Sequence, residues 1–299
     1  VIFKTMKQNI QLIKYDNRRN ASQFDLLLLE NLLQRADLSD ALRNYQKNNF
    51  YTILICTSGA GNHTIDFEDY SYQQGTILTI RKDQIHRYHY SESKGYLFVF
   101  TEDFFIQFFE KSEATKCLQL FNELITAPLT ELDPEQYKLF VPLISEIAQE
   151  YNNLQDEYAL PIIGSLLHIF LNKLLRQKSL SALQLQKRKY LPEFVKLQAL
   201  VEAHCLETKK VEDYAQKMNL STKTINNITQ TILHKSAKQF IDEIVILQIK
   251  RLLTNPNLSI KEIAYQAGFE ETTNFYKFFK KYVQNTPESF RGVCAKAFA

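Results

Sequence analysis

The sequence predicts an α+β protein in two parts: an antiparallel β-barrel or sandwich with flanking helices, followed by an all-helical part. Three observations predict this class. Short runs rich in β-branched and aromatic residues fill residues 50–100, helical patterns follow to residue 178, and only short helical segments follow from residue 190. The length of 299 residues also fits two domains.

Turn sequences rich in Gly, Asp and Ser separate the predicted strands. Strands this short favour an antiparallel sandwich or barrel over a βαβ fold. Before them, Ser22–Arg35 has a helical period, although its leucine run also fits a buried strand. The predicted strands are Phe50–Thr57, His63–Phe67, Thr76–Ile80, Ile85–Tyr90 and Tyr96–Phe100.

Two helices are predicted after the strands. Asp133–Gln136 forms a capping box with proline at the first helical position, so a helix begins there and extends to about Tyr151. A second helix covers about Asp156–Lys178 and carries apolar residues at alternating steps of three and four. That seam predicts a homodimer interface, and the alternative is that the same stripe packs in the protein's own core. Its residues are Leu160, Ile163, Leu167, Phe170 and Leu174.

A polar and basic linker, Gln177–Lys189, places the domain boundary near residue 186. The first domain, 1–186, would hold the barrel at about 45–102 and helices at about 133–178. The second domain, 187–299, has 18 Lys and Arg against 11 Asp and Glu, a net charge of +7. The first has 18 against 22, a net charge of −4. This asymmetry predicts that only the second domain meets a polyanion.

Several classes of protein are not expected. The longest apolar stretch, Leu160–Leu171, is shorter than the ~20 residues of a membrane span, and the N-terminus does not resemble an export signal. We therefore expect a cytoplasmic protein that does not enter a membrane. No P-loop, GxGxxG or Ser/His/Asp set stands out, so no enzyme activity and no cofactor are expected. Four cysteines lie far apart, which predicts neither disulfides nor a metal site: Cys56, Cys117, Cys205 and Cys294.

The basic domain contains an internal repeat. Val211–Ser221 aligns with Ile260–Glu270 at an offset of 49 residues, and each segment reads as a short helix followed by a tight turn. The turn residues are Asn219 and Gly268, the two residue types that most easily adopt a left-handed conformation. A single unit of this kind would also fit an ordinary pair of antiparallel helices.

Two such units, at about 209–233 and 259–283, favour nucleic-acid binding over that alternative, because they lie in tandem on a basic segment. The amphipathic helix Ala237–Thr254 joins them. A helix-turn-helix unit places its second helix in the major groove. Two units held by one helix are therefore expected to read two successive grooves, about 34 Å apart.

The segment Ser259–Arg291 closely resembles the C-terminal signature of the AraC/XylS family of bacterial transcription regulators. The match extends through the first unit and covers about 190–292. Its elements are Ser221, Ile225, Lys250–Leu253, Ile263–Ala264, Gly268–Phe269, Phe275, Phe278–Lys281, Thr286–Pro287 and Phe290–Arg291.

The resemblance implies residues that contact double-stranded DNA. Lysine can bind guanine and asparagine can pair with adenine in the major groove, whereas contacts to phosphate position the protein without specifying a sequence. The implied base contacts are Lys223, Asn226 and Asn227 in the first unit, and Thr272, Thr273 and Lys277 in the second. The implied phosphate contacts are Ser221, Lys280 and Lys281.

This chain departs from the family pattern in both units. Asn227 replaces the usual arginine, and Thr229–Gln230 replaces an aromatic residue and a lysine. His234 and Gln284 replace the usual glycine near the ends of the two recognition helices, at a cost of about 1 kcal/mol each. The first unit is therefore expected to be the weaker reader of DNA sequence.

The family implies a transcription activator that works with RNA polymerase and whose N-terminal domain is a cupin-like barrel that binds an effector and dimerises. We predict an effector pocket near Tyr51, His86 and Tyr88, with the alternative that these residues simply fill the barrel. The alternative function is a cupin-type enzyme with an accessory helical domain. Lys47–Asn49 stands where such an enzyme would have paired histidines, and His63 stands alone.

Overall fold

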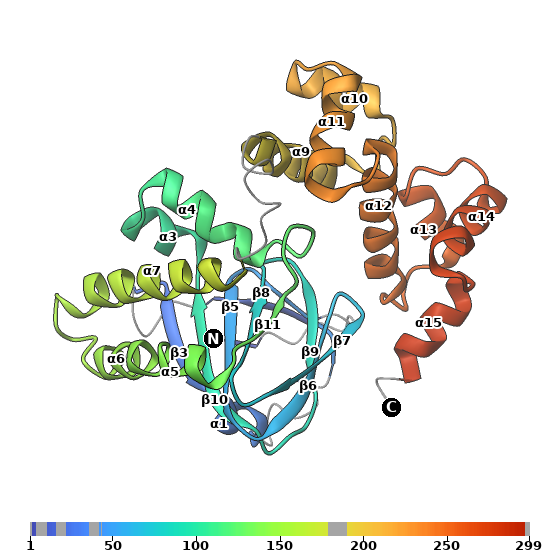
Figure 1. The fold of residues 1–299 in the computed structure, drawn as a ribbon. Coiled ribbons are helices and arrows are strands. Elements are labelled where there is room, and N and C mark those ends of the chain that lie inside the picture. The colour runs from blue at the N-terminus through green and yellow to red at the C-terminus, as the bar shows by residue number, and fades with distance from the viewer. Residues whose placement is uncertain are drawn as a thin grey trace. The chain divides into compact units, whose positions relative to one another are not determined.

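The computed structural model describes residues 2–3, 11–15, 22–35, 42, 44–178 and 190–296. The chain divides into two compact units, residues 1–180 and 181–299, which run from blue to yellow-green and from yellow to red in Figure 1. The predicted boundary near residue 186 and most of the predicted linker lie outside the described residues.

The first unit is built on two sheets. The six-stranded sheet has the order β1-β2-β4-β9-β6-β7, and the five-stranded sheet has the order β11-β8-β5-β10-β3. Neighbouring strands are antiparallel except β2 and β4, which are parallel. The strands are β1 (Ile2–Phe3), β2 (Gln11–Lys14), β3 (Phe24–Leu28), β4 (Gln46–Asn48), β5 (Tyr51–Ser58), β6 (Ala60–Ile65), β7 (Glu68–Gln73), β8 (Thr76–Ile80), β9 (Ile85–Tyr88), β10 (Lys94–Phe100) and β11 (Leu129–Glu131).

The two sheets face each other across one hydrophobic core, to which Ile13 and Ile65 contribute from one sheet and Leu78 and Val99 from the other. Strand pairing does not continue from one sheet to the other among the described residues, so the strands form a two-sheet sandwich, one of the two architectures that the short strands favoured. The α+β class is confirmed.

The five-stranded sheet is buried on both faces, because β5 alternates between two cores. Leu54 and Cys56 point into the core between the sheets, whereas Tyr51, Ile53 and Ile55 point into a second core under the helices. A strand buried on both faces reads as a continuous apolar run, as β5 does.

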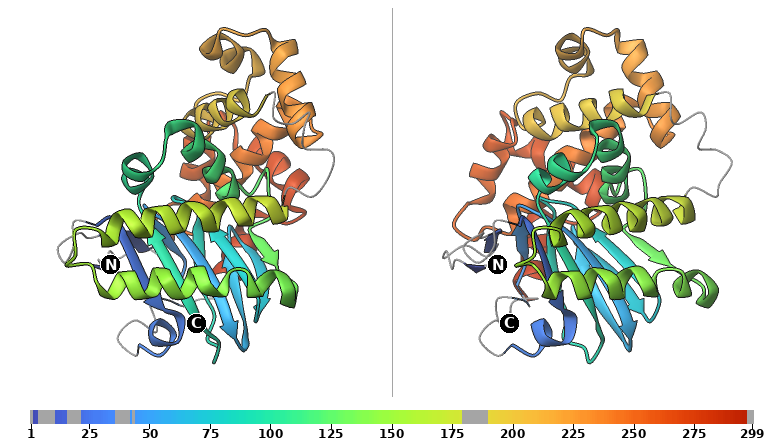
Figure 2. Two further views of the ribbon diagram at one scale, coloured as in Figure 1. Left: turned by 60° about the vertical axis from the view of Figure 1, so that its left-hand side comes forward. Right: turned by 90° about the vertical axis from the view of Figure 1, so that its left-hand side faces the viewer.

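Helices cover the outer face of the five-stranded sheet. Figure 2 shows α6 and α7 side by side across its strands. The helices of this unit are α1 (Leu29–Leu33), α3 (Glu102–Phe108), α4 (Lys111–Leu118), the 3-10 turn η2 (Gln119–Phe121), α5 (Pro134–Lys138), α6 (Val141–Asn152) and α7 (Ala159–Lys178).

The structure contains five strands that match no predicted strand, namely β1, β2, β4, β7 and β11, and it differs from the predicted elements in other places as well. β7 was not predicted because its residues are polar and mostly exposed, and the hairpin turn before it lies at Asp66 and Phe67, both with positive φ. Ser22–Arg35 contains β3 followed by α1 rather than one helix. The capping box at Asp133 is confirmed, but the helix that it opens ends at Lys138, and α6 follows as a separate helix.

The predicted dimer seam on α7 is wrong. Ile163, Leu167, Phe170 and Leu174 are fully buried in the core against the five-stranded sheet, and Leu160 packs against the same core. The seam is therefore intramolecular, which is the alternative that the pattern left open. By length and composition α7 is apolar enough to cross a membrane. Because Ile163, Leu167, Phe170 and Leu174 are buried against the five-stranded sheet, α7 is a core helix of this unit.

The second unit is all-helical. Serine N-caps at Ser221, Ser236 and Ser259 begin three of its helices, and the last two form capping boxes with Gln239 and Glu262. The helices are α9 (Leu191–His204), α10 (Val211–Met218), α11 (Thr222–Leu233), α12 (Ala237–Leu253), α13 (Ile260–Gln266), α14 (Thr272–Val283) and α15 (Pro287–Lys296).

Four helix ends of this unit depend on left-handed backbone. Asn219 (φ +55°) and Gly268 (φ +70°) form the predicted tight turns, and His234 (φ +56°) and Gln284 (φ +57°) terminate α11 and α14. A Cβ on Gly268 would lie 2.6 Å from the carbonyl oxygen of Leu206, so that turn requires glycine for space as well as for backbone conformation.

One side chain of α11 fixes the start of α12. The Asn226 Oδ1 atom accepts a hydrogen bond from the Ala237 backbone N–H at 3.0 Å, and Asn226 Nδ2 donates to the Thr222 carbonyl oxygen at 3.1 Å. Ala237 is the first residue of α12, where backbone N–H groups have no partner inside the helix. Asn226 therefore ties the two helices together.

We expect Asn226→Ala to lower the free energy of unfolding by about 1–2 kcal/mol, because it leaves the buried Ala237 N–H without an acceptor. The matched control is Asn227→Ala, since Asn227 is the next residue on the same helix but is exposed. It should change stability by less than about 0.5 kcal/mol. Chemical denaturation of both variants measures the difference, and equal losses would contradict the role given to Asn226.

Candidate nucleic-acid interface

The two helix-turn-helix units have the same turn geometry. In the first, the Leu220 N–H donates to the Ala215 carbonyl oxygen at 2.9 Å, and in the second, the Phe269 N–H donates to the Ala264 carbonyl oxygen at 3.0 Å. In each unit the turn residue has positive φ and precedes an apolar residue. The repeat seen in the sequence is thus a structural repeat, which gives α11 and α14 equivalent positions in their units.

The helix α11 exposes a polar face with one cation. Lys223 and Asn227 are exposed, and Ile225, Ile228 and Ile232 form the buried face. Asn226 is half-buried and its amide is engaged with Thr222 and Ala237, so it would have to give up hydrogen bonds within the protein to bind a base.

This chain has a threonine, Thr229, at the position of α11 where the family usually has an aromatic residue. Thr229 is fully buried, and its hydroxyl donates to the Asn226 carbonyl oxygen at 3.1 Å. A threonine hydroxyl that bonds back to its own helix needs no further partner, so the small side chain is tolerated in this core.

The helix α14 is the more basic of the two. Thr273 and Lys277 are exposed and Thr272 is half-buried, while Phe275 and Phe279 form the buried face. The remaining cations, Lys280 and Lys281, are exposed one turn further along, where phosphates adjacent to a groove would lie.

Two tyrosines of α14 are tied to other helices. The Tyr276 hydroxyl donates to the Glu288 carboxylate of α15. The Tyr282 hydroxyl donates to Asp242 of α12 at 2.8 Å. These contacts raise the pKa of both phenols to about 12, Tyr276 mainly through its bond to Glu288 and Tyr282 mainly through burial, so both remain neutral donors at physiological pH.

The Ser221 hydroxyl begins α11 by accepting a hydrogen bond from the Thr224 N–H at 3.1 Å, and the side chain stays exposed. Glu271 stands at the same position of α14 without a capping bond from its side chain. Sequence reasoning passed over Glu271, although a carboxylate at the start of a recognition helix can accept a hydrogen bond from cytosine N4.

Sequence reasoning also missed a lysine that joins the two units. Lys209, in the loop before α10, donates to the Ala267 carbonyl oxygen at 2.5 Å and lies 4.4 Å from the centre of the Phe269 ring. Those groups form the turn of the second unit. The lysine therefore connects one helix-turn-helix unit to the turn of the other, and burial lowers its pKa.

The structure divides the three residues of the predicted effector pocket. Tyr88 lines a cavity between the two sheets, together with Asn48 and Thr52. His86 lies behind that lining, where Asn48 Nδ2 donates to His86 Nε2 at 2.7 Å. Tyr51 belongs to the other face of β5, stacked on Phe100 under the helices, because side chains alternate along a strand.

The four cysteines are buried free thiols. Among the residues that the structure describes, no group of three or more His, Cys, Asp and Glu side chains could hold a metal ion. His63, predicted to stand alone, lies next to His86, with His63 Nε2 and His86 Nδ1 3.1 Å apart.

Comparison with known families matches both units. The family model described as "Helix-turn-helix domain" matches residues 214–292, and the one described as "AraC-like ligand binding domain" matches residues 31–161. The second match covers the strands β4 to β11 and the helices α3 to α6 of the first unit.

Similar proteins span most of the chain. The HTH-type transcriptional activator RhaS of Citrobacter koseri is 22% identical over 249 residues, which cover 82% of this chain and 86% of that protein. RhaS of Escherichia coli is 20% identical over 247 residues, with the same coverage. Among solved structures, ToxT from Vibrio cholerae is 14% identical, covers 90% of this chain and 93% of its own, and has a TM-score of 0.38. On the two matched domains and these relatives, the chain belongs to the AraC/XylS family and is a DNA-binding transcription regulator.

Proposed function

We propose that this protein activates transcription by reading two successive major grooves with α11 and α14. The observation that carries the proposal is the structural repeat: two units with the same left-handed turn, each exposing the polar face of its second helix. The relatives from Citrobacter koseri and Escherichia coli are named transcriptional activators, which supports activation rather than repression. Activation in turn implies RNA polymerase as a partner and the cytoplasm as the place of action.

Within this proposal the two recognition helices have different contacts. On α11, Lys223 and Asn227 are exposed and face the bases, with Asn226 holding the helix in place. On α14, Thr272, Thr273 and Lys277 face the bases. The phosphate contacts are Ser221, Lys280 and Lys281.

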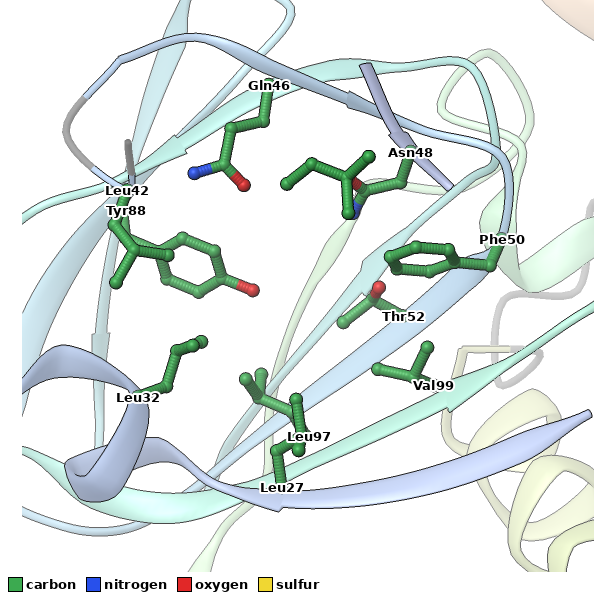
Figure 3. A pocket seen from close by; sticks show the side chains of 11 residues that line it. Leu27, Leu32, Leu42, Gln46, Asn48, Phe50, Thr52, Tyr88, Leu97 and Val99 are labelled. Carbon is green, nitrogen blue, oxygen red and sulfur yellow. The ribbon is translucent and has the colours of Figure 1, made fainter. Parts of the chain in front are cut away.

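The first unit would supply control. The family model that matches this unit is described as a ligand binding domain, and a cavity between its sheets is lined mainly by apolar side chains with a few polar ones (Figure 3). We infer that an effector bound there changes how the DNA-binding unit is presented. A cupin-type enzyme is not favoured as an alternative, because the relatives are transcription regulators.

A homodimer remains part of the proposal, with a different surface. The outward face of α7 exposes Ile162 (39%) and Ile169 (47%), seven residues and therefore two turns apart. These residues, rather than the buried seam, are available to a second copy of the chain.

We expect Lys277→Ala to weaken binding of the full chain to its specific DNA by about 5- to 160-fold, because one base contact contributes about 1–3 kcal/mol. A fluorescence-polarisation titration measures this with a probe selected from genomic fragments by the wild-type chain. Lys138→Ala, which removes an exposed lysine from α5 in the other unit, is the control. If the two variants bound the probe equally well, α14 would not be a reading helix.

Loss of a proposed phosphate contact is expected to change DNA binding in a different way from loss of a base contact. Lys280→Ala and Lys281→Ala should weaken binding to specific and unrelated DNA alike, and each should reduce the slope of log affinity against log salt by about 1. The same titrations at several salt concentrations measure the slope. An unchanged slope would mean that these lysines do not contact phosphates.

The proposed dimer surface can be tested by placing negative charges on the exposed face of α7. Wild type is expected to run as a dimer in size-exclusion chromatography with light scattering at micromolar concentration, and Ile162→Glu with Ile169→Glu as a monomer, since two carboxylates would be buried at the interface. Tyr90→Glu is the control, because Tyr90 is also exposed (67%) but lies beyond β9. A monomeric wild type would overturn the dimer, and a dimeric double variant would overturn this surface.

A further inference from the structure

A lysine in front of α10 is an exception within the internal repeat. At the offset of 49 residues, Lys209 aligns with Leu258, and each lies two residues before the first residue of a helix, α10 or α13. An apolar residue is common at this place, because it packs against the helix that it precedes. The fold of a single helix-turn-helix unit therefore does not explain why Lys209 is a cation.

The Lys209 ammonium group contacts the turn of the second helix-turn-helix unit. Its Nζ donates to the Ala267 carbonyl oxygen at 2.5 Å, lies 3.3 Å from the Gly268 carbonyl oxygen, and lies 4.4 Å from the centre of the Phe269 ring. Ala267 ends α13, where carbonyl oxygens lack partners inside the helix and where the helix dipole favours a cation. This turn therefore binds the lysine through two acceptors and an aromatic face.

The loop that carries this lysine is held on the first helix-turn-helix unit. The fully buried Tyr214 of α10 donates from its hydroxyl to the Thr208 carbonyl oxygen at 2.8 Å, and the Thr208 hydroxyl donates to Asp213 of the same helix. A Cβ on Gly268 would lie 2.6 Å from the Leu206 carbonyl oxygen, so the loop also touches the opposite turn through its backbone. A shift of one helix-turn-helix unit against the other would break these contacts.

The contact lies at the end of α14 that enters the groove. Base contacts of a helix-turn-helix unit come from the N-terminal part of its second helix, and the turn at Gly268 leads into that part of α14. Tyr282, which bonds α14 to α12, lies at the other end of the helix. Lys209 thus holds the end of α14 that is distant from the Tyr282 bond.

We propose that Lys209 is a positioning residue that fixes the spacing between the two half-sites, each half-site being the stretch of DNA that one recognition helix reads. While the lysine is bound, α11 and α14 keep one separation and one relative rotation. One added base pair moves a half-site by about 3.4 Å and rotates it by about 35°, which a fixed pair of helices does not follow. The inference rests on the proposed function and adds a rule of spacing to it.

The test uses the full chain and DNA probes that differ in spacing. The parent probe is a site selected from genomic fragments by the wild-type chain, with its two half-sites located by base substitution. Two further probes have one base pair added or removed between the half-sites. Wild type is expected to bind these two about tenfold more weakly or worse in fluorescence-polarisation titrations, because one helix loses its base contacts.

Lys209→Leu introduces the residue that the repeat has at the equivalent position, and it removes the ammonium group. It should bind the two altered probes within about threefold of the parent probe, because α14 can then follow a displaced half-site. Its affinity for a probe with only one intact half-site should equal that of wild type. Lys210→Leu is the control, since it removes the same charge from the next residue, which is exposed, and should keep the wild-type spacing preference.

An unchanged spacing preference in Lys209→Leu would overturn the proposal, even if the variant bound every probe more weakly, because a merely structural role alters affinity without altering preferred spacing. If Lys209→Leu does not fold, Lys209→Met, which keeps an unbranched stem, serves in the same titrations, and unfolding of both variants would also overturn the proposal. Absence of specific DNA binding by wild type would instead overturn the proposed function itself.

Discussion

The geometry of the DNA-binding unit depends on the helix α12. Three hydrogen bonds tie it to other helices along its length: Asn226 of α11 accepts from its first N–H, Tyr282 of α14 donates to Asp242 in its middle, and Arg291 of α15 donates to the Leu253 carbonyl oxygen at its end. The Ala237 N–H and the Asp242 carboxylate are buried groups of α12 that these bonds help to satisfy. Because α11 and α14 both bond to this one helix, the spacing between the two reading surfaces is a property of α12.

Lys209 adds a connection that does not pass through α12. It bonds to the carbonyl oxygen at the end of α13 and lies against the Phe269 ring, so the first unit contacts the turn of the second directly. A helix C-terminus attracts a cation, which explains why a lysine occupies this position. Two grooves on one face of DNA can be read together only by helices whose separation does not vary, and these contacts hold that separation.

The sequence predicted the DNA-binding unit better than the sheets because its signals are local. The tight turns at Asn219 and Gly268 each depend on residues within about one helical turn, and both have left-handed backbone where the sequence predicts it. The role of Asn226 could not be predicted in this way. Its partner Ala237 lies in the next helix, and the position of Asn226 along α11 is equally compatible with a base contact.

Strand β7 and the α7 seam were misjudged for the corresponding reason. Alternation of apolar residues identifies strands with one buried face, and the polar β7 at the sheet edge has little of it. The apolar stripe of α7 shows that its residues are buried but not against what, and here the five-stranded sheet supplies the partner. The prediction of the effector pocket was limited in the same way. Tyr51 and Thr52 are adjacent in sequence, but side chains alternate along a strand, so Tyr51 points into packed core and Thr52 into the cavity.

The two reading helices are unequal, and this suggests an order of events on DNA. The exposed face of α14 has Lys277, Lys280 and Lys281, whereas α11 has Lys223 as its one lysine or arginine. Electrostatic attraction to phosphate is long-ranged and independent of sequence, so α14 is the helix that attracts the duplex first. Once α14 lies in its groove, the fixed spacing set by α12 places α11 over the next one. Binding by α11 then requires no further search, and a helix with few charges can still discriminate between sequences through short contacts to bases, such as the one proposed for Asn227.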